Sequence, residues 1–311
     1  MRIVSLVPAG TEILFALGLG ADVVGVSHEC ELPVGETPRP RLTRSVVRTD
    51  GLSSAEIDAA IASQVAAGTP VYEIDAELLS ALRPDLILTQ GLCDVCALPA
   101  RAVDAALCQL SWRPAIVSLD AHSVAGVLDS IRDVGERTGH PTRARALIDE
   151  LQSRLDRVAT AVAARPRMPV VCLEWLDPPY ACGHWIPEMV ECAGGTELIG
   201  RAGMRSVQMS WTDIERARPA VVIVMPCGYD LDRAVPELEG VAACAPWTRA
   251  VGDATVYVAA GGVYFTRPGP GLVTGVELLA SVLHPDAASW YVPANAITKW
   301  RVPIASQREG C

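Results

Sequence analysis

The chain has 311 residues, half of them hydrophobic, and a formal net charge of −10 at pH 7. This length exceeds what one hydrophobic core usually serves, so it predicts two lobes or one large α/β domain. The acidic balance argues against sequence-independent binding to nucleic acid and against adsorption to an anionic membrane surface. Apolar runs are short and interrupted, and roughly 18 to 20 residues are needed to span a bilayer, so we expect no membrane insertion.

The N-terminal sequence MRIVSLVPAGTEILFALG reaches Pro8 and Gly10 before a signal-peptide core of useful length can form. We therefore expect the chain, as written, to be cytoplasmic. A start further upstream would instead allow a periplasmic or extracellular location. In the cytoplasm the ten cysteines would stay reduced thiols rather than form a disulfide framework.

Seven apolar runs of strand length follow in chain order. Most are rich in Val and Ile without polar alternation, which is typical of parallel strands covered on both faces. Helix-like stretches lie between them, so the sequence predicts the α/β fold class. The runs are residues 3–7, 23–27, 85–89, 115–119, 170–175, 221–225 and 256–260.

Two internal similarities predict a repeated architecture. LLSALRPDLIL (78–88) and DIERARPAVVI (213–223) each combine a helix, an Arg-Pro stop and a strand. LGLGADVVG (17–25) likewise resembles CAGGTELIG (192–200). Repetition this short can also arise because every βα unit needs the same turn residues. We predict two Rossmann-like lobes with mainly parallel sheets.

A long helix is predicted between the two lobes. From Thr142 to about Ala164, apolar residues recur at three- and four-residue steps. This pattern predicts an amphipathic helix of about six turns, roughly 35 Å long, which limits hinge bending more than a flexible linker would. We expect an N-terminal lobe over residues 1–122, a connecting helical segment over 123–166 and a C-terminal lobe over 167–311.

The loops after the predicted strands are rich in cysteine, histidine and aromatic residues. In parallel α/β sheets, ligands bind at the carboxyl ends of the strands, where loops and helix N-termini converge. Thiolates and imidazoles gathered there could bind a soft or borderline metal, although no spacing matches a zinc finger or ribbon. The candidate metal ligands are Cys30, Cys93, Cys96 and Cys182.

The C-x-x-C pair of Cys93 and Cys96 allows three interpretations: a pocket or metal site, a redox couple, and simple packing. A thioredoxin-like role is disfavoured, because the pair lies in one half of a much longer duplicated chain. Free cysteine also fills small apolar gaps. Packing is the role we expect for Cys108, Cys172, Cys192 and Cys244.

Aromatic residues gather in the later loops, three of them within eleven residues. Rings in loops rather than core strands suit a flat, partly apolar ligand, with structural packing of single rings as the alternative. The candidate ligand-binding residues are Glu12, His28, Glu174, Trp175, Tyr180, His184, Trp185, Tyr229 and Tyr264.

Signatures of common enzymes do not occur in the sequence. It contains no G-x-S-x-G, P-loop or H-E-x-x-H motif, and no catalytic residues are assigned. We therefore expect a binding protein rather than an enzyme. The alternative is a cytoplasmic enzyme that handles a metal or cofactor through Cys93, Cys96 and His28.

The opening pattern S-x-x-P-x-x-T-E-x-L-x-x-L-G and the closing pattern R-P-G-P-x-x-x-x-G-x-E-x-L-x-x-x-L-H-P are fairly specific together. With LLSALRPDLILTQ and GHWIPEMVECAGG between them, residues 2 to 285 resemble the periplasmic-binding family for vitamin B12, iron-siderophore and heme ligands. The resemblance implies two α/β lobes bridged by one long helix, with the ligand held between them. It also implies that an ABC importer permease is a partner.

The cobalamin-binding branch is the most similar, because its members also present aromatic residues to a flat corrin. We therefore expect a cobalamin-like corrinoid or related metal chelate as ligand in the cleft between the lobes, with a bound metal ion as a further option. His28 or His184 could supply an axial imidazole, and Cys93 and Cys96 are alternative soft ligands. The missing leader and the cysteine-rich loops depart from the family pattern and favour a cytoplasmic relative.

Overall fold

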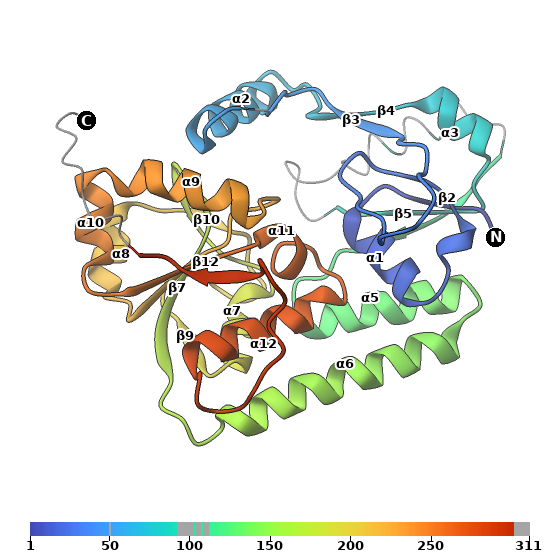
Figure 1. Cartoon of the computed structure of the whole chain (residues 1–311). Helices are drawn as coiled ribbons and strands as arrows, with labels where there is room; N and C mark the ends of the chain where they lie inside the picture. Colours follow the sequence, from blue (N-terminus) through green and yellow to red (C-terminus); the bar gives the residue numbers. More distant parts are fainter. Residues whose placement is uncertain (50, 92–102, 104–106, 108–111, 302–311) are drawn as a thin grey trace. The chain divides into compact units, whose positions relative to one another are not determined.

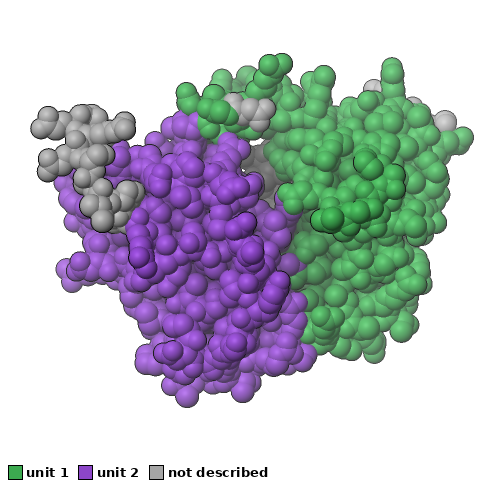
Figure 2. Space-filling model, viewed as in Figure 1, with its two compact units in different colours: residues 1–52, 56–151, 268–270 green, residues 53–55, 152–267, 271–311 purple. Residues whose placement is uncertain are grey.

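The computed structural model describes residues 1–49, 51–91, 103, 107 and 112–301. By their contacts these residues form two compact units, which Figure 2 colours separately. Unit 1 contains Met1–Leu52, Glu56–Leu151 and Pro268–Pro270, and unit 2 contains Ser53–Ala55, Gln152–Arg267 and Gly271–Cys311. None of the helices within the described residues combines the length and apolar character needed to cross a bilayer.

Unit 1 is built on a four-stranded sheet in which every pair of neighbours is parallel. The strands are β1 (Ile3–Ser5), β2 (Val23–Val26), β5 (Leu86–Thr89) and β6 (Ala115–Ser118), with a separate antiparallel pair β3 (Thr43–Ser45) and β4 (Tyr72–Ile74). Their order in the sheet is β2-β1-β5-β6, and β1 and β5 bury all of their side chains, as expected of runs of Val, Ile and Leu. The helices are α1 (Pro8–Ala16), η1 (Gly20–Asp22), α2 (Ser54–Ala66), α3 (Ala76–Leu82) and α5 (Val124–Arg137). The first two residues of α2 group with unit 2 by their contacts.

Unit 2 contains a seven-stranded mixed sheet. The strands are β7 (Met168–Leu176), β8 (Pro179–Ala181), β9 (Gly195–Glu197), β10 (Val207–Gln208), β11 (Val221–Val224), β12 (Thr255–Ala259) and β13 (Ile297–Lys299). The helices are α7 (Ile186–Cys192), α8 (Trp211–Ala217), α9 (Leu231–Ala242), α10 (Ala245–Val251), α11 (Gly261–Tyr264) and α12 (Gly271–Leu283). The strand order is β10-β8-β7-β11-β12-β13, with β9 also paired to β7. Helices α8, α9 and α10 cover one face, and α7 and α12 lie on the other side (Figure 1).

The two units repeat one strand order, as the internal similarities predict. The parallel strands β9-β7-β11-β12 of unit 2 follow the same sequence of connections as β2-β1-β5-β6 of unit 1. Helices α3 and α8 both end at an arginine in the left-handed conformation, with φ of 44° at Arg83 and 49° at Arg218. A proline follows each arginine and prevents the helix from continuing. The predicted α/β fold class with mainly parallel sheets is confirmed.

The predicted long helix is α6 (Pro141–Val162), which has 22 residues and is labelled in Figure 1. Its buried stripe includes Leu151, Leu155 and Val158, as the sequence periodicity predicts. At 1.5 Å per residue its length is about 33 Å. The grouping by contacts differs from the predicted boundaries after residues 122 and 166: α5 packs against α1 and belongs to unit 1, and the division falls within α6.

Candidate ligand-binding site

The loops that follow three neighbouring strands of unit 2 lie directly against one another. The amide of Cys227, after β11, donates a hydrogen bond of 2.9 Å to the carbonyl of Glu174 near the end of β7. The amide of Gly262, after β12, donates one of 3.3 Å to the carbonyl of Tyr229. Residues at the carboxyl ends of these three strands therefore lie together.

Glycine permits this close approach at one position. A Cβ atom on Gly261 would lie 2.2 Å from the carbonyl oxygen of Pro226 and 2.6 Å from that of Met225. Both contacts are with backbone, so a side chain at residue 261 could fit only if the two loops moved apart. The loop after β12 is thus fixed against the loop after β11.

Trp175 and Tyr229 form an aromatic pair at this edge of the sheet. Their rings meet edge to face with centroids 5.4 Å apart, and the Trp175 indole N–H donates a 3.2 Å hydrogen bond to the carbonyl of Ser54, which belongs to unit 2 by its contacts. Tyr229 is 4% exposed, and the Arg233 guanidinium lies 4.0 Å from its ring centroid. Burial raises the pKa of the Tyr229 phenol, and Arg233 opposes this shift. Tyr229 therefore supports Trp175 more than it offers a free surface.

Tyr180 lies beside Trp175 on the hairpin formed by β7 and β8. The two residues are direct partners in the antiparallel register, so their side chains project from the same face of the sheet. Both are half-buried. This hairpin therefore holds two of the predicted aromatic residues next to each other.

His184 adopts an unusual backbone conformation in the loop after β8. Its φ is 52°, its amide donates a 2.6 Å hydrogen bond to the carbonyl of Met204, and its own carbonyl accepts one of 2.8 Å from Gly203. A left-handed conformation is uncommon for a residue other than glycine and often marks a functional loop. The half-buried His184 ring stacks at an angle on Trp185, with centroids 5.6 Å apart.

The Trp185 side chain is buried, whereas a ring that contacts a ligand is expected to be partly exposed. It is 4% exposed, and its indole N–H donates a 2.6 Å hydrogen bond to the carbonyl of Phe265. Trp185 therefore joins the start of α7 to the loop after α11. Packing within unit 2 buries the ring and satisfies its polar atom, so a ligand contact of Trp185 stays a prediction that the buried position does not favour.

Tyr264 is held in place by the backbone of α12. A Cβ atom on Gly275 would lie 2.1 Å from the Tyr264 carbonyl oxygen, so α11 and α12 touch at a position where only glycine fits. The Tyr264 side chain is half-buried, and burial, with a contribution from Tyr291, raises the pKa of its phenol. The fixed backbone gives this ring a defined place in the strand-end loops.

In unit 1, His28 lies in the loop after β2 and is half-buried. Its Nδ1 atom is 2.7 Å from the Thr43 hydroxyl, its Nε2 atom is 3.8 Å from a Glu29 carboxylate oxygen, and its ring lies 5.4 Å from that of Tyr72. Burial, together with the positive charge of Arg41, lowers the pKa of His28. The imidazole is therefore neutral at pH 7, the form in which histidine binds metals.

Glu12 is half-buried in α1 and lies close to a glycine of unit 1. A Cβ atom on Gly269 would be 2.5 Å from a Glu12 carboxylate oxygen. The T-E of the opening sequence pattern and the P-G-P of the closing pattern therefore contact each other. Glycine at residue 269 leaves room for the carboxylate beside the backbone.

The cysteines predicted as metal ligands do not form a metal site among the described residues. Cys30 is 1% exposed, and its sulfur lies 3.0 Å from the Thr11 hydroxyl and 3.1 Å from that of Ser27. Cys182 is fully buried beside Cys172. Both residues lie in the interior of their own unit, and metal binding by them stays a prediction.

The other candidate ligands in the described part of the chain are also too scattered to form a metal site. Within residues 1–49, 51–91 and 112–301, no group of three or more His, Cys, Asp or Glu side chains is placed to hold a metal ion. Cys93 and Cys96 lie outside the described residues, so the three interpretations of the C-x-x-C pair remain predictions.

A half-buried carboxylate that sequence reasoning missed lies beside β7, on β9. Glu197 accepts hydrogen bonds from the amides of Cys172 at 3.0 Å and of Ile199 and Gly200 at 3.1 Å each. Burial raises the pKa of Glu197, and these backbone hydrogen bonds oppose the shift. The carboxylate joins β9 to β7, and a single glutamate in a short strand gives no sequence signal for that role.

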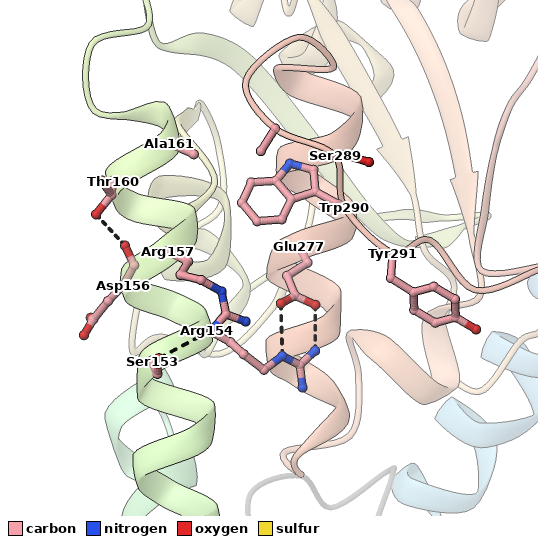
Figure 3. Close-up of a pocket in the computed structure, with 11 residues that line it drawn as sticks. Ser153, Arg154, Asp156, Arg157, Thr160, Ala161, Glu277, Ser289, Trp290 and Tyr291 are labelled. Carbon is pink, nitrogen blue, oxygen red and sulfur yellow. Dashed lines mark hydrogen bonds and ion pairs between the residues drawn. The ribbon is translucent and has the colours of Figure 1, made fainter.

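A groove of about 870 Å³ in unit 2 runs between α6, α12 and the segment after α12 (Figure 3). Figure 3 shows the ion pair of Arg154 and Glu277 on its floor, with Trp290 projecting toward α6 and Tyr291 pointing away from the pair. A second cavity of about 310 Å³ is lined by residues that include Trp211, Trp247 and Glu237. Neither lining contains a predicted ligand-binding residue.

Comparisons with known proteins agree with the fold. Residues 3–249 match the family model described as periplasmic binding protein. The chain is 26% identical over 299 residues to YvrC of Bacillus subtilis (strain 168), an uncharacterized ABC transporter substrate-binding lipoprotein, covering 92% of this chain and 80% of that protein. The resemblance found in the sequence patterns is confirmed.

Solved structures of the same architecture include three with similar coverage. The vitamin B12 binding protein BtuF of Vibrio cholerae is 19% identical, with a TM-score of 0.65 over 91% of this chain and 96% of its own. A periplasmic heme binding protein from Pseudomonas aeruginosa is 18% identical, with a TM-score of 0.67 over 96% and 97%. An ABC transporter substrate-binding protein from Listeria monocytogenes EGD-e is 18% identical, with a TM-score of 0.69 over 92% and 99%. At these identities the likeness establishes the fold.

Proposed function

The chain belongs to the periplasmic binding protein family, and from this we propose that it binds a cobalamin-like corrinoid or related metal chelate as the substrate-binding component of an ABC importer. The observation that carries the proposal is the aromatic group at the strand ends of unit 2. Trp175, Tyr180 and Tyr264 are each half-buried, so part of every ring remains open while its base is fixed. Relatives of the same fold are described as binding vitamin B12 or heme, which are flat chelates.

Within unit 1, the neutral imidazole of His28 is a candidate axial ligand for a metal chelate. Burial and Arg41 keep the His28 pKa low, and Thr43 orients the ring through Nδ1. A chelate with an open axial position would take the Nε2 lone pair as ligand, because only an unprotonated nitrogen coordinates a metal. We retain His184 as the alternative axial ligand.

The enzyme alternative has no support from the comparisons. The family consists of substrate-binding proteins, and the Bacillus subtilis relative is described as one. The metal-handling chemistry proposed for Cys93, Cys96 and His28 would also need the two cysteines that lie outside the described residues.

The predicted cytoplasmic location is not supported either, because the matched family is described as periplasmic and the Bacillus subtilis relative as a lipoprotein. We infer a location outside the cytoplasm, with an importer permease as partner. Fractionation of cells that express the native gene tests this inference. Recovery with the cytosolic marker alone would contradict it.

Titration of the purified protein with cyanocobalamin, hemin and a ferric siderophore tests the ligand class. Absorbance and tryptophan fluorescence should change saturably with at least one of them, because Trp175 lies at the proposed site. The variant Tyr264→Leu should weaken that binding by about tenfold, consistent with the loss of one aromatic contact. The variant Tyr257→Leu is the matched control, because Tyr257 is also half-buried but lies in the middle of β12. No response to any of the three compounds would refute the proposal.

A further inference from the structure

Two buried cysteines face each other across the β7–β8 hairpin. The antiparallel register pairs Leu173 with Ala181, so the next residues along the ladder are Cys172 and Cys182. The Cys182 amide donates a 3.2 Å hydrogen bond to the Cys172 carbonyl, which extends the ladder to this pair. Directly opposed residues of an antiparallel ladder project to the same face of a sheet, with Cα atoms about 4.5 to 5.5 Å apart. Disulfides span roughly 4.4 to 6.8 Å between Cα atoms, so the geometry suits a cross-strand bond.

The two side chains also meet. Both residues are fully buried, and the thiols of Cys172 and Cys182 interact with each other through a hydrogen bond. We propose that Cys172 and Cys182 form a disulfide that closes the β7–β8 hairpin. The reaction breaks two S–H bonds and forms one S–S bond. The two electrons and two protons pass to a small-molecule or protein disulfide, which is reduced to two thiols.

The surroundings of the pair tolerate this change. Glu197 lies next to Cys172 and would lose its contact with that thiol on oxidation. It would keep its three backbone hydrogen bonds from Cys172, Ile199 and Gly200, so the carboxylate would not be left without partners. The disulfide therefore needs no rearrangement of the β7–β9 contact.

The burial of the two thiols determines when the disulfide can form. Thiolate is the species that attacks a disulfide, and burial raises the pKa of both thiols, that of Cys172 to about 11. Exchange should therefore be slow in the folded protein and fast while the hairpin is still forming. The expectation of reduced thiols rested on a cytoplasmic location, which the comparisons do not support. An oxidising compartment would supply the disulfide donor.

The bond would rigidify the proposed ligand site. The closed loop carries Trp175 and Tyr180, and His184 follows Cys182 by two residues. Fixing the base of the hairpin lowers the entropy that these side chains lose when a ligand orders them. This consequence rests on the proposed function, whereas the disulfide itself does not.

Peptide mapping of the full-length protein tests the bond. The protein is denatured, refolded in a mixture of reduced and oxidised glutathione, treated with iodoacetamide and digested with trypsin and a glutamate-specific protease. Cleavage after Arg167, Glu174 and Glu188 separates the two cysteines. Peptide 168–174 joined to peptide 175–188, reverting to two free peptides on reduction, is the expected result.

Variants and a stability measurement complete the test. Cys182→Ser should abolish the joined peptide, whereas Cys227→Ser, which removes a half-buried cysteine of the same unit, should leave it unchanged. The oxidised protein should melt roughly 5 °C or more above the reduced protein, because closing a short loop restricts the unfolded chain. Alkylation of both Cys172 and Cys182 in the refolded protein, or pairing of either with another cysteine, would overturn the proposal. Neither outcome depends on whether a chelate binds.

Discussion

Arg154 and Glu277 form a bidentate ion pair that joins α6 to α12 within unit 2. Arg154 Nε donates to one Glu277 carboxylate oxygen at 3.0 Å, and Nη2 donates to the other at 2.6 Å (Figure 3). Nη2 also donates to the Thr274 hydroxyl at 2.8 Å. The side chains are only 22% and 11% exposed, so solvent screens the pair weakly. Glu277 belongs to the closing sequence pattern, and this ion pair gives a physical reason for the glutamate in it.

Replacing one residue of this pair should destabilise the protein more than expected from replacing both residues together. Glu277→Leu or Arg154→Met alone leaves a mostly buried charge without the opposite charge of the pair, which should lower the free energy of unfolding by about 3 kcal/mol. The double variant should lose clearly less than the sum of the two. Urea denaturation of the three variants measures this coupling. Asp129→Asn, in the exposed Arg132–Asp129 pair, is the control and should change stability little. Strict additivity of the two single losses would contradict the expected coupling.

Gly275 should control both stability and ligand binding through Tyr264. In Gly275→Ala the new methyl group would meet the Tyr264 carbonyl oxygen at 2.1 Å, so α11 must move. We expect a loss of about 1–3 kcal/mol in unfolding free energy and weaker chelate binding. Gly240→Ala in α9 is the matched control, because a Cβ atom on Gly240 would have no other atom within 4 Å. It should stabilise the protein by roughly 0.5–1 kcal/mol. Equal melting temperatures for the two variants would refute this explanation.

Seven of the strands were predictable because each coincides with a continuous apolar run. Every one of the seven runs overlaps a strand, and β1, β5 and β11 bury every side chain, so no polar alternation interrupts the signal. The parallel strand β9, with the sequence GTE, has no such run. The short strands β8 and β10 carry no such signal, because they have three and two residues and form edge pairings. Their formation depends on β7, to which β8 pairs.

The sequence predicted which loops form the candidate site, but not which of their side chains are accessible. Topology places Glu174, Tyr229 and the loop after β12 together, and the strand-end rule anticipates this. The depth of a side chain depends on tertiary packing, so the sequence could not show that Trp185 and Cys30 point inward. The ion pair of Arg154 with a residue 123 positions away was equally invisible, because no local pattern links the two.

His28 should provide the axial nitrogen if hemin or aquocobalamin binds. His28→Ala should remove the absorbance shift of axial imidazole ligation, whereas His140→Ala should retain it, because the half-buried His140 lies at the turn before α6. Burial and Arg41 lower the His28 pKa below 6.5, so the wild-type shift should persist at pH 6.5 and disappear in more acidic solution. Loss of ligation while the pH is still above 6.5 would contradict this assignment.

The lowered pKa of His28 also determines how the stability of the protein changes with pH. Because the folded-state pKa of His28 is lower than its unfolded value of 6.5, the unfolded chain binds more protons in mildly acidic solution. The contribution of His28 to stability is therefore present above pH 6.5 and is lost as the pH falls through the folded-state pKa. Urea denaturation between pH 5 and pH 7.5 should show a shallower loss of stability in His28→Ala than in the wild type.

Cys172 should make the reduced protein sensitive to alkali. Burial is the main cause that raises its pKa from 9.0 to about 11, so the unfolded chain releases this proton at lower pH than the folded chain does. The contribution of Cys172 is complete below pH 9 and is lost as the pH rises through about 11. Two pKa units correspond to about 3 kcal/mol of unfolding free energy.

Denaturation of the reduced protein between pH 8 and pH 11 measures this loss. Cys172→Ala should show a flatter decline than the wild type, although the raised pKa of Cys182 leaves part of the slope in place. The oxidised protein, with no thiol at either position, should resemble Cys172→Ala or be flatter still. Identical slopes for the wild type and Cys172→Ala would show that the thiol stays accessible to solvent in the folded state.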